Sequence, residues 1–220
     1  MSLLILCDIG NTTYHFFDTK SNRSTRVLLK QKLPKKFDRR RIYFISVNQK
    51  ASIRLKKNYK SCIDVRDMLN FETHYKGMGI DRQVACALYD HALIVDCGSA
   101  ITVDVMKNAQ HKGGFILPGL NSYEKMFKKI SPALDYSFSA DVNTDKLPQN
   151  TRDALSYATH KSTVLPIIEV IKKYKNLKCF ITGGDGKLLQ QYIPKSVYKK
   201  HLLFDSMKEI IDANNRTAKR

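Results

Sequence analysis

A stretch near the N-terminus returns later in the chain, and this repeat is the feature that most constrains the fold. The first copy is LILCDIGNTTYHFFD, over Leu4–Asp18, and the second is ALIVDCGSAITVDVM, over Ala92–Met106. Asp8 recurs as Asp96, 88 positions later, and the glycine two residues on recurs with it. A repeat at so long a spacing predicts two domains of common ancestry rather than a solenoid, whose period is shorter.

Each copy of the repeat predicts a β-hairpin with an acidic turn. A short apolar run ends in an Asp, a Gly and a small polar residue follow, and a second strand-like run comes next. Backbone N–H groups in a glycine-containing turn form an anion site, and a carboxylate beside them can hold a hydrated cation. Two such turns could clamp a metal–nucleotide between them. The alternative is that each Asp only caps its own turn.

The patterns that follow each hairpin predict an α/β fold with two domains, residues 1–91 and 92–220. Short apolar runs indicate strands, and apolar residues at helical spacing indicate helices. The further predicted strands cover 24–29, 41–47, 62–65, 112–119 and 178–182. The predicted helices cover 49–59, a stretch beginning near 81, 120–130, 151–174, 187–192 and 206–213.

Composition indicates a globular protein of the cytoplasm. The chain has 220 residues, of which 43% are hydrophobic and 26% charged. No apolar run approaches the length that spans a bilayer, and the N-terminus lacks the pattern of a secretory signal. Five cysteines without C-x-x-C spacing indicate reduced thiols, mostly in apolar segments. We therefore expect no membrane association.

The charge balance is strongly basic, with 38 Lys and Arg against 20 Asp and Glu and a net charge of +18. Such a charge is compatible with nucleic-acid binding. The basic runs are scattered, however, and none carries the interleaved aromatic residues of a stacking platform. We interpret them as a solvated surface that attracts anionic ligands, and do not expect nucleic acid as a partner.

Six short motifs, taken together and in order, resemble those of type III pantothenate kinase. They are Asp8–Thr12 (DIGNT), Gly79–Arg82 (GIDR), Asp96–Asp104 (DCGSAITVD), Gly113–Gly119 (GGFILPG), Asn150-Thr151 and Thr182–Gly184 (TGG). The resemblance spans nearly the whole chain. It implies membership of the superfamily of acetate and sugar kinases and actin-like ATPases. Their two halves are ribonuclease-H-like domains with an inter-domain active-site cleft.

The resemblance implies a reaction in which ATP phosphorylates pantothenate to 4′-phosphopantothenate, the first step of coenzyme A biosynthesis. It makes Asp81 the residue that accepts the hydroxyl proton, although an Asp here also fits a helix N-cap. Arg82 is expected to bind the pantothenate carboxylate with its planar guanidinium; otherwise it is a solvated helix-surface charge. The remaining residues expected to bind substrate are Gly79, Ile80, Tyr75 and Thr151, although Asn150-Thr151 also fits a plain helix cap.

The resemblance also implies an ATP site and two cations. The residues expected to bind ATP are Asp8, Ile9, Gly10, Asn11, Thr12, Thr13, Tyr14, His15, Ser99, Gly183 and Gly184. Asp8 is expected to contact Mg²⁺, directly or through water. Asp96 matches the position of a monovalent cation, K⁺ or NH₄⁺, although the residues alone equally allow a second Mg²⁺-facing carboxylate. Thr182–Gly184 also fits an ordinary strand-to-helix turn.

Family likeness further implies a homodimer. The sequence departs from the family between Cys62 and Phe71, where the usual loop ending in Thr-Gly is missing. Two alternatives stay open: a kinase for another small hydroxyl acceptor, and a non-catalytic regulator that binds nucleic acid on the same scaffold. The presence of Asp8, Asp81 and Asp96 favours catalysis.

Overall fold

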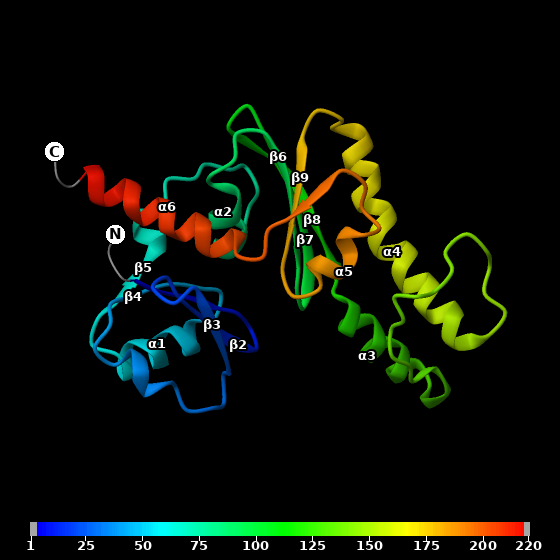
Figure 1. The fold of residues 1–220 in the computed structure, drawn as a ribbon, viewed down its shortest axis with the longest axis horizontal. Coiled ribbons are helices and arrows are strands. Elements are labelled where there is room, and N and C mark those ends of the chain that lie inside the picture. The colour runs from blue at the N-terminus through cyan, green and yellow to red at the C-terminus, as the bar shows by residue number, and fades with distance from the viewer. Residues whose placement is uncertain (1–3, 218–220) are drawn as a thin grey trace. The chain divides into compact units, whose positions relative to one another are not determined.

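The computed structural model describes residues 4–217, which divide into two compact units (Figure 1). The first unit comprises the chain up to Leu88 together with the residues from His201 onward. The second runs from Tyr89 to Lys200. Each unit is built on one mixed five-stranded sheet with helices, so the predicted α/β class is confirmed.

The sheet of the first unit has the strand order β3-β2-β1-β4-β5. Strand β2 pairs antiparallel with both β1 and β3, and β4 and β5 run parallel to β1. The strands are β1 (Ile5–Ile9), β2 (Thr13–Asp18), β3 (Arg23–Leu28), β4 (Ile42–Ser46) and β5 (Cys62–Asp64). The helices are α1 (Gln49–Asn58), α2 (Ile80–Cys86) and α6 (Leu202–Thr217), with short 3₁₀ turns at Lys35–Phe37 and Val65–Met68.

The sheet of the second unit repeats this topology, with the order β10-β9-β6-β7-β8. Its strands are β6 (Ala92–Cys97), β7 (Ala100–Lys107), β8 (Gln110–Pro118), β9 (Lys178–Thr182) and β10 (Ser196–Tyr198). Its helices are α3 (Leu120–Ile130), α4 (Thr151–Lys173) and α5 (Gly186–Gln190), with a 3₁₀ turn at Pro132–Leu134. The sequence repeat therefore corresponds to a repeated fold, with β1 equivalent to β6.

Strand β1 is central because its residues are apolar on both faces. Leu4 and Leu6 pack in a cluster with residues of α2 and α6, whereas Ile5 and Cys7 pack in another with residues of α1. Side chains alternate between the two faces of a strand, so Asp8 belongs to the α2/α6 face. A strand buried on both faces thus ends in one carboxylate.

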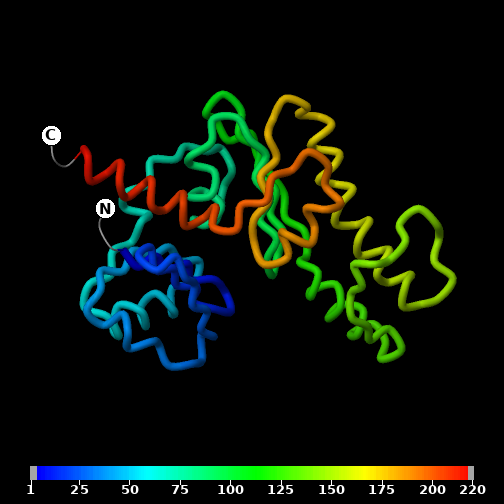
Figure 2. The backbone as a smooth tube through the Cα atoms, in the orientation of Figure 1, coloured from blue at the N-terminus to red at the C-terminus, as the bar shows by residue number. Residues whose placement is uncertain are grey.

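Helix α6 packs with the first unit, where Phe204, Met207 and Ile211 join Leu6 in one buried cluster. Contacts between α6 and α2 tie the two helices together, and Figures 1 and 2 show them side by side. The predicted second domain, 92–220, included this segment, so the observed division differs from the prediction. The spacing of apolar residues identifies which face of a helix is buried, but it does not show which domain core that face packs against.

In the second unit, α4 covers one face of the sheet. Val164 and Ile167 pack with Val95 and Cys97 in the buried cluster. The long connection from α3 to α4, visible in Figure 2, is tied back to α4 by hydrogen bonds. Among them, Ser139 N donates to Ser156 Oγ at 3.1 Å. This face is structural, and the opposite face carries Asp96 by strand alternation.

The predicted elements are confirmed with few exceptions. Helix α6 begins four residues before the predicted start, and β10 was not predicted at all. A strand of three residues beside lysines offers too little periodicity for a prediction. Among residues 4–217, no helix is long and apolar enough to cross a membrane.

Candidate active site

The first acidic turn connects β1 to β2. Gly10 N donates to Thr13 O at 3.1 Å and closes the turn, while the side chains of Asn11 and Thr12 are exposed. Asp8 lies directly opposite His15 in the antiparallel pair, so their side chains share one face of the sheet. The predicted ATP-binding residues from Asp8 to His15 therefore form one continuous hairpin.

His15 is a neutral neighbour of Asp8. Its burial, together with the charges of Arg26 and His201, lowers the pKa of the imidazole to about 4. The ring packs edge-on against Phe204, with 4.8 Å between the ring centroids. At neutral pH the imidazole adds no positive charge beside Asp8.

Asp81 lies in the first turn of α2, and Gly79 is the N-cap. The alternative that Asp81 itself caps the helix is therefore wrong, although its Oδ1 accepts a hydrogen bond from Arg82 N at 2.9 Å. A Cβ added to Gly79 would overlap Asp81 Oδ1 and approach Val47 Cγ1 to 3.7 Å. The carboxylate is thus packed against a position that only glycine leaves open.

Asp8 and Asp81 come to neighbouring strand ends of the same sheet. Val47 follows β4, and its N–H donates to Ile9 O at 3.2 Å, at the end of β1. Because Gly79 lies near Val47, the start of α2 is placed beside the carboxyl ends of β1 and β4. Ligands of open α/β sheets bind at such strand ends.

Tyr75 and Arg82 are brought together, as their predicted shared role requires. The Arg82 guanidinium carbon lies 4.6 Å from the centroid of the Tyr75 ring, a cation–π contact. Arg82 is only 6% exposed, so the alternative of a solvated surface charge is wrong. The stacked pair also anchors the loop that leads into α2.

A pocket of about 650 Å³ opens beside the predicted substrate residues Gly79 and Ile80. Its walls come from the ends of β4 and β5 and the first turns of α1 and α2, all in the first unit. Polar side chains line most of it, among them Arg66 and Gln83.

The second acidic turn, between β6 and β7, is one residue shorter than the first. Gly98 N donates to Ala100 O at 3.0 Å, and Ser99 is exposed at the tip. The Ser99 carbonyl accepts hydrogen bonds from Gly119 N at 3.2 Å and Ser122 Oγ at 3.0 Å. The start of α3 therefore fixes the turn that carries Ser99.

Gly183 packs directly against this turn. Its φ of +90° favours glycine, and a Cβ here would overlap Cys97 O and Asp96 Oδ1. Two residues on, Asp185 N donates to Cys97 O at 3.0 Å. Burial raises the pKa of the Cys97 thiol, and the nearby carboxylates of Asp96 and Asp185 raise it further. Gly183 and Gly184 thus form the predicted strand-to-helix turn beside Asp96.

Asp185 is a candidate site residue that the interpretation of the sequence did not include. Its position directly after the two glycines was the available signal, since the turn that presents Gly183 also presents the next side chains. It adds a second carboxylate to the surroundings of Cys97.

Thr151 is the first residue of α4, and the N-cap is Asn150. Asn150 Oδ1 accepts from Asp153 N at 2.9 Å, so the capping interpretation of this motif is confirmed. Thr151 itself is exposed in the second unit, whereas Asp81 belongs to the first. Its role toward substrate stays a prediction.

Oxygen ligands for Mg²⁺ are present at the two turns. Among residues 4–217, no group of three or more His, Cys, Asp and Glu side chains forms a preformed metal cage. Mg²⁺ typically keeps several waters and binds one or two carboxylates together with substrate phosphates. A single carboxylate beside a turn predicted to bind phosphate fits that chemistry, and Gly183 leaves space at Asp96 that a side chain would fill.

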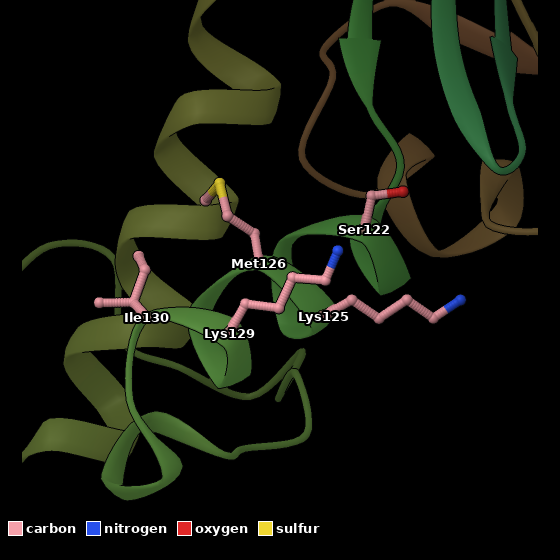
Figure 3. A pocket seen from close by; sticks show the side chains of 5 residues that line it. All are labelled: Ser122, Lys125, Met126, Lys129 and Ile130. Atoms are coloured by element: carbon pink, nitrogen blue, oxygen red, sulfur yellow. The ribbon is translucent and has the colours of Figure 1, made fainter.

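A second hollow, of about 390 Å³, lies along α3 (Figure 3). Its lining residues are Ser122, Lys125, Met126, Lys129 and Ile130. None of these is a predicted site residue, although Ser122 also holds the Ser99 turn. The polar pocket in the first unit is the better candidate for substrate.

Comparisons with solved structures first define the fold. Crystal structures of MreB 5 from Spiroplasma citri and of a 2-dehydro-3-deoxygalactonokinase protein from Sinorhizobium meliloti superpose with TM-scores of 0.51 and 0.54. They are only 10% and 9% identical in sequence and cover 98% and 96% of the chain and 98% and 96% of their own lengths. The fold is therefore that of actin-like ATPases and sugar kinases. The sequence model of type III pantothenate kinase matches residues 4–173, and the chain belongs to this family.

Similar relatives extend over nearly the whole chain. The type III pantothenate kinase of Wolinella succinogenes is 40% identical over 95% of this chain and 97% of its own length. That of Campylobacter jejuni is 41% identical over 96% and 98%. A C. jejuni crystal structure, described as a Baf family transcriptional activator, has a TM-score of 0.79 at 38% identity, covering 96% of this chain and 99% of its own.

The packing of Gly79 against Asp81 predicts how adding one methyl group at Gly79 affects the reaction rate. Gly79→Ala should displace the Asp81 carboxylate and, with Asp81 in the catalytic role expected from the sequence, lower kcat by about 100-fold. Its φ of −60° suits alanine, so the melting temperature should change little. Steady-state kinetics and thermal unfolding of the variant test this. A folded variant with normal kcat would contradict the assigned packing.

Proposed function

We infer that the chain is an ATP-dependent kinase that phosphorylates the primary hydroxyl of pantothenate, giving 4′-phosphopantothenate and ADP. The observation that carries this inference is the family match over residues 4–173, together with relatives of about 40% identity along nearly the full length. The reaction begins coenzyme A biosynthesis. The placement of Asp8 and Asp81 at neighbouring strand ends supports it.

We propose Asp81 as the group that accepts the hydroxyl proton. The acceptor oxygen forms a bond to the γ-phosphorus of ATP, the bond from that phosphorus to the β–γ bridging oxygen breaks, and the hydroxyl proton passes to the carboxylate. Asp81 Oδ1 is held by Arg82 N, which leaves the second oxygen for substrate. Gly79, Ile80, Tyr75 and Thr151 are the proposed substrate-binding residues. Because Arg82 is buried under Tyr75, we propose that it positions Tyr75 and Asp81 rather than binding the pantothenate carboxylate as expected from the sequence.

The two acidic turns are the proposed phosphate-binding elements. In the first unit these are the residues from Asp8 to His15, and in the second Ser99, Gly183 and Gly184. Bound Mg²⁺ would neutralise charge on the phosphates, with Asp8 as its protein partner. Asn11 and Ser99 are exposed at the two turns, which supports close approach of an anion.

The proposed partner of Asp96 is a monovalent cation, K⁺ or NH₄⁺. A carboxylate with Asp185 nearby and glycine in place of a side chain supports a cation at this position. A second Mg²⁺-facing role fits the same features.

We further propose that the protein is a cytoplasmic homodimer that binds pantothenate and ATP. Five free cysteines suit a reducing compartment. The second candidate function is regulation, because one similar structure carries the name of a transcriptional activator. The curated C. jejuni relative of comparable identity is named a kinase, which favours catalysis.

A coupled ADP-release assay tests the proposed function. ADP formation from MgATP should depend on pantothenate, and the rate should be higher in potassium or ammonium than in sodium chloride at equal ionic strength. Pantothenate-independent turnover, or none, would contradict the kinase assignment. Equal rates in the three salts would contradict only the monovalent cation.

Asp81→Asn should lower kcat by about 100-fold or more, because a carboxamide cannot accept the proton. ATP binding, measured by calorimetry, should be unchanged, since the proposed phosphate contacts lie on the two turns. Phosphorylation of pantothenate at a near-normal rate would show that another group takes the proton.

A further inference from the structure

The polar pocket of the first unit contains one guanidinium, that of Arg66. Arg66 lies two residues after the end of β5 and is exposed. Its Nη2 donates to Ser46 O at 3.3 Å, a neutral carbonyl at the end of β4. Within the part of the chain that the structure describes, Arg66 forms no salt bridge.

The pocket around Arg66 has an apolar part and a charged part. The lining comprises Ser46, Val47, Asp64, Arg66, Gly79 and Gln83, with further residues of α1 and α2. Val47 is 40% exposed and provides an apolar patch next to Gly79. Asp64 is the one carboxylate in the lining, and its Oδ1 accepts from Arg66 N at 3.0 Å. The pocket thus offers an apolar surface at one position and a cation at another.

The strand order separates this cation from the reacting groups. Asp8 ends β1, Asp81 lies by the end of β4, and Arg66 follows β5, the edge strand of the sheet. Neighbouring strands lie nearly 5 Å apart, so β5 is about 10 Å from β1. An acceptor that presents its hydroxyl to Asp81 would extend toward Arg66 on the side away from Asp8.

We propose that Arg66 binds the carboxylate of the acceptor and so selects an anionic substrate. The inference rests on the proposed function and assigns a specificity-determining residue to it. Pantothenate carries its carboxylate at the end opposite to its primary hydroxyl, and its geminal methyl groups lie next to that hydroxyl. The methyl groups match the apolar patch at Val47, and the carboxylate matches the guanidinium, which pairs best with planar anions.

A phosphate of ATP is the other anion that Arg66 could bind. The position of Arg66 beyond β4 favours the carboxylate, because the proposed phosphate-binding turn belongs to β1, two strands away. If Arg66 binds the carboxylate, its loss raises the KM for pantothenate; if it binds a phosphate, its loss raises the KM for ATP. Steady-state kinetics therefore separates the two.

The test compares wild type, Arg66→Ala, Arg66→Lys and Lys57→Ala with two acceptors, pantothenate and pantothenyl alcohol, whose carboxylate is replaced by a hydroxymethyl group. Lys57 is an exposed residue of α1 outside the pocket lining and controls for the loss of one positive charge. Arg66→Ala should raise the KM for pantothenate about tenfold, as expected for loss of a charged hydrogen bond. Arg66→Lys should raise it less. The KM for ATP and for the alcohol should stay at the wild-type values.

Each other outcome overturns the inference. An unchanged KM for pantothenate excludes Arg66 from carboxylate binding, and an equal rise for both acceptors means a general effect on the pocket. A rise in the KM for ATP assigns Arg66 to a phosphate. Wild type serves as the control for the reaction itself: if it does not phosphorylate pantothenate, the proposed function fails first. Thermal unfolding should show that Arg66→Ala folds, because the exposed side chain forms a single weak hydrogen bond.

Discussion

The structure depends on a buried central strand that ends in one carboxylate. In β1 and again in β6, apolar side chains on both faces lock the strand into its sheet, so the Asp near its end has little freedom to move. Burial of that apolar surface is the main driving force for each unit. The same burial that stabilises the unit therefore positions Asp8 and Asp96, and a tight turn, closed by Gly10 N or Gly98 N, follows each of them.

Glycine packing then sets the surroundings of each carboxylate. Gly79 leaves space for Asp81, and Gly183 leaves space for Asp96 and the Cys97 carbonyl. Gly183 follows a strand far away from Asp96 in sequence, whereas Gly79 is the N-cap of the helix that carries Asp81. At Gly79 the role is local space alone, because any residue can adopt its φ, whereas Gly183 also has a positive φ that favours glycine.

Sequence patterns predicted the two hairpins, the strands that follow them and most helices, because apolar periodicity and turn residues are local signals. They did not predict that α6 packs with the first unit, because an amphipathic pattern does not show which core the helix packs against. The burial of Arg82 under Tyr75 and the position of Arg66 in a pocket depend on how loops fold over strand ends. Asp185 was missed because its contact with the Cys97 carbonyl is made by the backbone and leaves no side-chain pattern.

Our central proposal is that the two acidic turns, one from each unit, bind the same nucleotide. A double-mutant cycle in MgATP binding, measured by calorimetry on wild type, Asp8→Asn, Asp96→Asn and the double variant, tests it most directly. The account predicts that each single variant weakens binding and that the two effects are coupled by about 0.5 kcal/mol or more. Additive effects within about 0.3 kcal/mol, or no effect of either variant, would contradict it.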